Sequence, residues 1–270
     1  MNKSTPTKLP RLQRGFYRNG PSHRDGADVS FADIQKVFEF PHITIGRWVT
    51  ANEQQLAANL FFDALCDLAD ILQVKESVLS LNQTLSLCFG SGGQRHSSAH
   101  YDPAKRQLAL AKNAGGGALA HEWFHAFDHY ICQKMFADTK PQDFASQAWL
   151  NGKVLVQHPL NQIMADFFAT LFVHESAPND YVRSAIQADR AMHSYYFARP
   201  QELAARAFEA IIQDHPYKNS FLVQGTKKSL EARLGVYPRG SFRIQLGNSL
   251  MLYFRSLAQA LARQDAKRIK

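Results

Sequence analysis

Cysteine, glutamate and long apolar segments are scarce in this 270-residue sequence. Its three cysteines, Cys66, Cys88 and Cys132, are far apart and form no Cys-x-x-Cys pair. This spacing excludes a disulfide framework and a cysteine-based metal site, and it favours buried free thiols. No apolar run approaches the roughly 18 residues of a membrane span, and the first residues lack the apolar stretch of a secretory signal. We therefore expect a cytoplasmic protein that does not enter a membrane.

Positive charge is in excess, with 31 Lys and Arg residues against 23 Asp and Glu residues, and it gathers at the two ends of the chain. Residues 1–28 are polar, basic and interrupted by proline and glycine, so we expect a disordered basic tail followed by a single domain over residues 29–270. Basic tails can bind nucleic acid through its phosphates, but they are more often only solvated ends. No recognised nucleic-acid-binding motif accompanies these tails.

The pattern of apolar and helix-breaking residues predicts an α+β fold with a small mixed β-sheet and a helix-rich C-terminal half. Residues 29–115 are expected to hold a helix and the sheet, and residues 116–270 are expected to be mostly helical. The elements predicted in the first part are a helix of about 23 residues capped by Thr50, a strand at 79–89 and a hairpin that joins 99–101 to 106–111. The helices predicted after the hairpin lie at 118 to beyond 132, 160–174, 180–197, 200–213 and 246–265.

The stretch His121-Glu122-Trp123-Phe124-His125 carries the most specific chemical signal in the sequence. Two histidines four residues apart on a helix lie on one face and can bind the same Zn²⁺ ion, while the glutamate beside the first histidine can reach water at that metal. The alternative is a pair of surface histidines on an ordinary helix. We favour the metal site because the surrounding helix has a core-packing apolar face, and buried ionisable groups need partners or a metal.

Several other polar residues are candidates for supporting roles. Asp128 continues the stripe of the two histidines, either to orient a ligand imidazole or as an exposed polar residue. His129 is expected at the rim of the site. Asp166 is either an acceptor for a histidine or a paired carboxylate in the core. Three residues before the 200–213 helix either donate a hydrogen bond to a developing oxyanion or pack in the core: His193, Tyr195 and Tyr196.

A catalytic zinc needs a third protein ligand, and only eight glutamates are available to supply it. Most of them occupy positions better explained by loops, caps or helix ends. Glu202 and Glu209 instead lie on an apolar helix whose one charged stripe also contains Arg206, and such a helix should be buried with that stripe facing partners or a site. Arg206 can pair with one carboxylate and leave the other for the metal. We choose Glu202 as the ligand and Glu209 as the reserve; the alternative is a structural Glu–Arg–Glu network without metal.

The segment 115–130 resembles the metal-site region of the bacterial CLCA_X family, and it is also similar to a domain that accompanies large polyvalent proteins of phages and mobile elements. The likeness covers roughly residues 40–215 and includes Ile45–Thr50, Phe62–Leu65, Phe89–Gly93, Ala99–Tyr101, Ala198–Pro200 and Glu202–Ala210. This resemblance implies a zincin-like fold and a metallopeptidase in which His121 and His125 bind zinc and Glu122 is the base. The stretch that begins at Glu202 also resembles the third-ligand helix of some Glu-zincins.

These features predict a zinc-dependent metallopeptidase that hydrolyses peptide bonds of a peptide or protein substrate, with Glu122 activating the zinc-bound water. The alternative is a zincin-fold binding module without catalysis, associated with nucleic acid through its basic tails. The strand at 106–111 directly precedes the motif helix. It is either an ordinary sheet strand or a strand that pairs with an extended peptide along the cleft.

Overall fold

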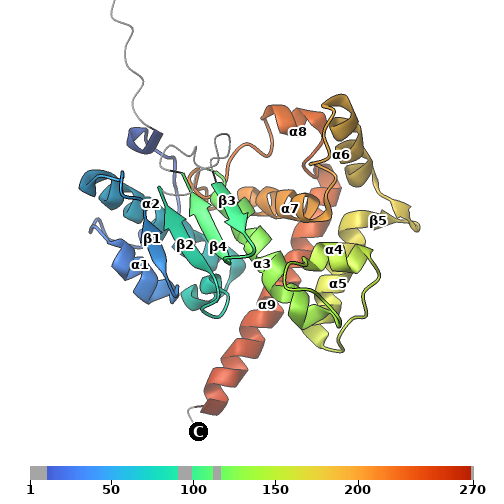
Figure 1. Ribbon diagram of the computed structural model, residues 1–270, viewed down its shortest axis with the longest axis horizontal. Helices are drawn as coiled ribbons and strands as arrows, with labels where there is room; N and C mark the ends of the chain where they lie inside the picture. Colours follow the sequence, from blue (N-terminus) through green and yellow to red (C-terminus); the bar gives the residue numbers. More distant parts are fainter. Residues whose placement is uncertain (1–10, 91–98, 112–116, 269–270) are drawn as a thin grey trace, which may run out of the picture.

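The computed structural model describes residues 11–90, 99–111 and 117–268, and it has the α+β fold that the sequence predicts (Figure 1). The small sheet and the first two helices form one side of the molecule, and the helices from residue 119 onward form the other. The first ten residues of the predicted tail lie outside the described residues. So do two glycine-rich parts of the family resemblance, at 91–93 and 115–116.

The helices of the described residues are α1 (Phe31–Phe38), α2 (Ala51–Leu72), α3 (Leu119–Met135), α4 (Ala145–Leu150), α5 (Pro159–Phe172), α6 (Asp180–Ala191), α7 (Pro200–Asp214), α8 (Leu230–Leu234) and α9 (Gly240–Arg268). Short 3₁₀ helices cover η1 (Arg11–Gln13) and η2 (Glu76–Ser80). The strands of the main sheet are β1 (Ile43–Ile45), β2 (Ser86–Phe89), β3 (Ala99–Asp102) and β4 (Gln107–Leu110), and a small hairpin pairs β5 (Val173–His174) with β6 (Ala177–Pro178).

The main sheet has the strand order β1-β2-β4-β3. β1 and β4 are parallel to β2, and β3 pairs with β4 as the predicted antiparallel hairpin, with His100 opposite Ala109. β4, the strand before the motif helix, is paired on both sides, so it is an ordinary sheet strand and cannot accept a peptide. The strand predicted at 79–89 is shorter than expected, because left-handed backbone conformations at Leu81, Asn82 and Gln83 turn the chain before β2 begins.

The capping signals place the helix starts well. The hydroxyl of Thr50 accepts a hydrogen bond from the backbone N–H of Glu53, and the Glu53 carboxylate accepts one from the backbone N–H of Thr50 at 2.9 Å. This reciprocal pair satisfies two of the N–H groups that a helix start leaves without a partner, and it begins α2 where the sequence predicts.

Aromatic side chains join α3 to α7 and α9. Trp123, Phe124 and Phe208 are fully buried, and the Phe124 and Phe208 rings stack with their centroids 4.8 Å apart. The indole N–H of Trp123 donates to the carbonyl of Leu79 at 3.0 Å. The ring centroids of Trp123 and Phe254, which lies on α9, are 6.2 Å apart. Because α7 presents several fully buried alanines, its backbone can approach α3 closely. This packing fixes α3 and α7 side by side.

The C-terminal half departs from the prediction at several helix ends. α6 ends at residue 191, not 197, because the Asp189 carboxylate accepts backbone N–H groups of Tyr196, Phe197 and Ala198 at 2.9–3.0 Å and holds a loop in place. α9 starts six residues earlier than predicted, at Gly240. The short helices α4 and α8 were not predicted.

The expected disorder of residues 11–28 is wrong. Arg18 makes two contacts of 2.7 Å with the buried carboxylate of Asp67 on α2, and Arg24 pairs with Asp63 at 3.0 Å. The basic residues of this segment therefore find acidic partners on the domain and order the chain. These arginines are also occupied by carboxylates, so they are not free for the nucleic-acid contact that the basic tail suggested.

The three cysteines are buried thiols that form no disulfide, as predicted. Burial raises the pKa of the Cys66 and Cys132 thiols to about 12, which keeps both protonated. Within the described ranges, no helix combines the length and the apolar character needed to cross a membrane.

Candidate metal centre

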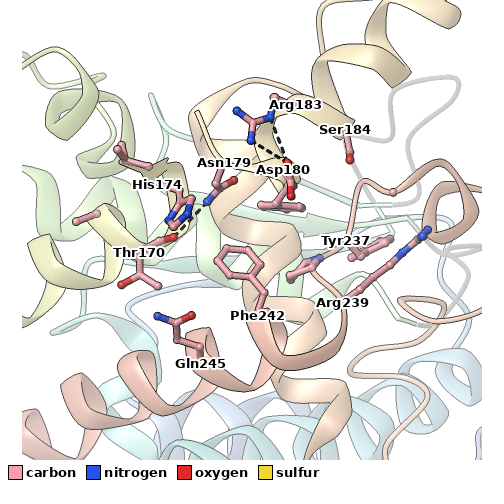
Figure 2. A pocket seen from close by; sticks show the side chains of 15 residues that line it. Thr170, His174, Asn179, Asp180, Arg183, Ser184, Tyr237, Arg239, Phe242 and Gln245 are labelled. Carbon is pink, nitrogen blue, oxygen red and sulfur yellow. Dashed lines mark hydrogen bonds and ion pairs between the residues drawn. The ribbon is translucent and has the colours of Figure 1, made fainter. Parts of the chain in front are cut away.

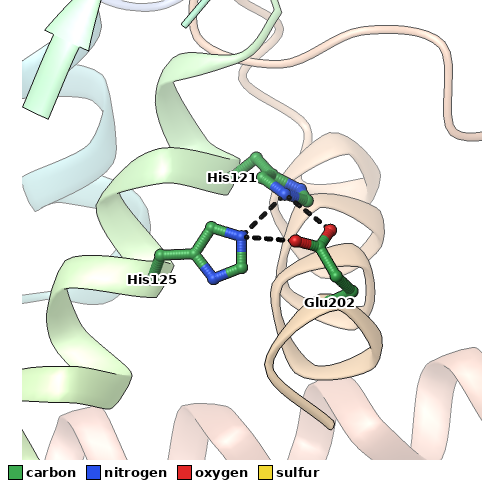
Figure 3. A group of neighbouring side chains, drawn as sticks. All are labelled: His121, His125 and Glu202. Atoms are coloured by element: carbon green, nitrogen blue, oxygen red, sulfur yellow. Dashed lines mark hydrogen bonds and ion pairs between the residues drawn. The ribbon is translucent and has the colours of Figure 1, made fainter. Parts of the chain in front are cut away.

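The side chains of His121, His125 and Glu202 converge in the space between α3 and α7 (Figure 3). The Nε2 atoms of the two histidines are 3.0 Å apart. The Glu202 carboxylate places Oε2 at 3.3 Å from Nε2 of His121 and Oε1 at 3.3 Å from Nε2 of His125. Ligand atoms bound tetrahedrally to zinc at about 2.0–2.1 Å lie about 3.3–3.4 Å from one another. The three side chains therefore have the spacing of ligands around one ion.

An unpartnered buried carboxylate oxygen in this cluster also fits a cation. His121, His125 and Glu202 are only 7–8% exposed. Among the described residues, Oε2 of Glu202 is buried without a hydrogen bond; Nδ1 of His125 is too, but it lies on the side of the ring away from the convergence point. A buried polar atom without a partner costs free energy, and native proteins rarely leave one. A metal ion between the three side chains would satisfy the Glu202 oxygen and the facing imidazole nitrogens together.

Glu209, the reserve ligand, lies on the other side of His121. Its Oε2 atom is 2.9 Å from Nδ1 of His121, whereas the convergence with Glu202 and His125 is at Nε2. A carboxylate that accepts the Nδ1–H of a histidine fixes the tautomer and leaves Nε2 free to bind a metal. The geometry therefore gives the two glutamates of α7 different positions, Glu202 at the convergence point and Glu209 behind it.

The cluster carries strong electrostatic coupling. Burial alone would lower the pKa of His121, but the carboxylates of Glu209 and Glu202 outweigh burial and raise it to about 10. Burial would raise the pKa of Glu202, but its contacts with His121 and His125 outweigh burial and hold that pKa well below its ordinary value. Without a metal, the cluster is therefore stabilised by a proton on His121 between two carboxylates.

Arg206 does not form the ion pair that the sequence suggested. Its guanidinium donates to the hydroxyl of Tyr237 at 3.1 Å, and that hydroxyl donates to Oε2 of Glu209 at 3.2 Å. The guanidinium also lies 4.9–5.6 Å from the ring centres of Tyr196, Phe197 and Tyr237. Arg206 thus reaches Glu209 through Tyr237, a residue that sequence reasoning missed because it lies beyond α7 and belongs to no motif.

Glu122 and Tyr196 border the same cluster. Glu122 is half-buried, and none of the described side chains donates a hydrogen bond to its carboxylate, so it is available as a base. Burial raises the pKa of Tyr196, and the neighbouring carboxylates of Glu202 and Glu122 raise it further. Tyr196 is 40% exposed, but the carboxylates of Glu202 and Glu122 act on it, whereas Tyr195, which is 72% exposed, and the exposed His193 show no such link to the cluster among the described residues. Of the three, Tyr196 is the one placed at the cluster.

The remaining polar candidates, Asp128, His129 and Asp166, either form hydrogen bonds within the fold or are exposed on a helix. Asp128 is fully buried and accepts hydrogen bonds from the backbone N–H and the hydroxyl of Ser146 at 2.8 and 2.6 Å, which anchors the start of α4. His129 is buried, not at the rim, and its Nδ1 atom lies 2.7 Å from the hydroxyl of Tyr101. Asp166 is exposed on α5, so neither role predicted for it is correct.

Comparison with known proteins gives one match. Residues 188–261 match the family model of large polyvalent protein-associated domain 1. This agrees with one of the two resemblances inferred from the sequence, although it overlaps only the end of the expected range and extends beyond it. The matched stretch contains α7 with both glutamates, but not the two histidines of α3. No curated protein and no solved structure matches the chain.

Proposed function

We propose that this protein is a zinc-dependent peptidase with a zincin-like site, in line with its resemblance to the CLCA_X family. The observation that carries the proposal is the convergence of His121, His125 and Glu202, with contacts of 3.0–3.3 Å, beside the carboxylate of Glu122, whose charge acts on His121. Two histidines and one glutamate are the donor set of a catalytic zinc site that keeps one position open, and Glu122, next to His121 in the chain, supplies the base.

Each residue of the proposed site has one role in the hydrolysis. When bound, zinc supplies a Lewis acid that polarises the substrate carbonyl and makes water more acidic. Glu122 takes the proton of the attacking water and passes it to the leaving amine. The phenol of Tyr196 donates a hydrogen bond to the oxygen on which negative charge develops. Glu209 holds the Nδ1–H of His121 and so keeps Nε2 directed at the zinc position.

β3 supports a peptide as the substrate. It is the edge of the described sheet next to β4, and it contacts α3 through the hydrogen bond between Tyr101 and His129. The backbone groups of an edge strand can pair with an extended peptide, which would then run beside the metal helix.

Metal analysis combined with peptide cleavage tests the proposal. Purified protein should contain about one zinc per chain, and His121→Ala should lose it. Glu122→Gln should keep zinc but lose cleavage of a quenched-fluorescent peptide library by at least ~100-fold, because the proton acceptor is gone. His193→Gln, which removes an exposed histidine without a described hydrogen bond or ion pair to the cluster, is the matched control and should change neither. Protein without stoichiometric zinc, or a Glu122→Gln variant with full activity, would refute the proposal.

A further inference from the structure

We propose that a cavity separate from the metal centre binds a small aromatic anion. The cavity has a volume of about 710 Å³, within the range of small-molecule sites. Figure 2 shows that its walls come from three segments: the end of α5 with β5, the first turns of α6, and residues 235–245 at the start of α9. The last of these segments lies within the stretch that matches the family model.

Tyr181, Tyr237 and Phe242 form the aromatic part of the cavity wall, and the two tyrosine hydroxyls are already used inside the protein. The hydroxyl of Tyr181 donates to the carbonyl of Leu203 at 2.9 Å, and that of Tyr237 donates to Glu209 at 3.2 Å. Both rings therefore line the cavity with their carbon atoms. The ring of Phe242 lies beside them (Figure 2). A lining of this kind favours an occupant with a flat apolar body.

One cation on the wall is free for such an occupant. The Asn179 side chain is committed to backbone groups at the end of α5 and the start of α6, and Arg183 pairs with Asp180 at 2.8 Å. Arg239 lies at the edge of the cavity, between it and a neighbouring hollow lined by Arg233 and Arg243. It is exposed and gives one N–H to the carbonyl of Ala232, while its other N–H groups meet no acceptor among the described residues. A guanidinium with free N–H groups beside an apolar wall selects a carboxylate, sulfonate or phosphate on the ligand.

The cavity is linked to the metal centre by Tyr237, and this part of the inference rests on the proposed zinc site. The ring of Tyr237 forms cavity wall, its hydroxyl binds Glu209, and Glu209 binds Nδ1 of His121 at 2.9 Å. An occupant packed against the ring restrains the hydroxyl on Glu209. Occupancy should therefore tighten zinc binding, and zinc should tighten the occupant by the same factor.

Two fluorescent probes test the cavity directly. 1-Anilinonaphthalene-8-sulfonate carries an anionic group, and N-phenyl-1-naphthylamine has the same aromatic body without it. Arg239→Gln should weaken binding of the sulfonate by about 10-fold or more, because a hydrogen bond to a charged group is lost, and should leave the neutral probe unchanged. Phe242→Ala should weaken both. Arg233→Gln, which removes an exposed arginine outside this cavity, is the matched control.

Each result decides between alternatives. Sulfonate affinity that is the same in wild-type protein, Arg239→Gln and Phe242→Ala, with all three folded by circular dichroism, would overturn the cavity proposal. Zinc affinity is then measured with and without saturating sulfonate probe. We expect at least a 3-fold tightening that disappears in Tyr237→Phe. Absent zinc binding would refute the proposed function but leave the cavity result standing, whereas zinc binding that the probe does not change would refute the link alone.

Discussion

Replacing the two α7 carboxylates one at a time should separate a zinc ligand from a residue that orients a ligand. Glu202→Gln removes the charged oxygen that lies 3.3 Å from both metal-facing nitrogens. Glu209→Gln leaves these contacts intact and weakens the 2.9 Å contact behind His121, together with the hydrogen bond from Tyr237 at 3.2 Å. Loss of an orienting carboxylate typically lowers metal affinity 10- to 100-fold, about 1.4–2.7 kcal/mol. Loss of a ligand should exceed that range.

The assay is a competitive zinc titration against a chromophoric chelator at fixed pH. Glu202→Gln should bind zinc more than 100-fold more weakly than wild type, and Glu209→Gln should fall 10- to 100-fold below it. Glu175→Gln, an exposed glutamate in the β5–β6 turn, is the control and should bind like wild type. If Glu209→Gln loses more affinity than Glu202→Gln, the assignment of the two glutamates is reversed. If neither variant loses affinity, the cluster is not the zinc site.

Three further predictions concern the fold around the site. Burial raises the pKa of Asp128 from 3.8 to about 6. The folded protein therefore favours the protonated side chain, whose contribution to stability is complete below pH 3.8 and is lost as the pH rises through 6. Asp128→Asn should remove up to ~3 kcal/mol of the fall in the free energy of unfolding between pH 4 and pH 7, measured by urea unfolding at both pH values. Asp67→Asn leaves Arg18 without its partner and should cost about 2–3 kcal/mol and speed proteolysis within residues 11–28; an unchanged cleavage rate would contradict the docking of that segment. Phe208→Ala should destabilise the fully buried contact between α3 and α7 by about 3–5 kcal/mol in the same unfolding assay, and a loss below 1 kcal/mol would mean that this contact does not hold the helices together.

Local signals account for most of what the sequence predicts well. The start of α2 follows from Thr50 and Glu53, whose capping interactions span three residues. The spacing of His121 and His125 follows from the helical repeat, which any stable helix imposes. The hairpin of β3 and β4 follows from a short turn between two strand-like segments. Each of these features depends on neighbours in the chain, so no knowledge of the tertiary structure is needed to predict it.

The features that the sequence does not reveal join distant segments. Arg18 and Asp67 are 49 residues apart in the chain, and His121 and Glu209 are 88 apart. Glu202 and Glu209 are seven residues apart on α7 and so share one face of that helix. Which of them meets Nε2 of His121 depends on how far α7 is shifted along α3, and that shift is set by the packing of Phe208 and its neighbours, not by any local pattern.

The choice between a metal site and a purely structural network rests on which polar atoms the cluster leaves unpaired. A network that exists only to stabilise the fold should pair its buried polar atoms, because each one left without a partner costs roughly 1–3 kcal/mol. Here the two Nε2 atoms face each other at 3.0 Å, so at most one of them can carry a proton, while Oε2 of Glu202 has no hydrogen bond among the described residues. When His121 is protonated, its Nδ1–H pairs with the Glu209 carboxylate. Its single Nε2–H cannot pair fully with both Nε2 of His125 and the Glu202 carboxylate, which converge on the opposite edge of the ring. A divalent cation can, and for this reason we favour zinc over an ion network as the partner of this cluster.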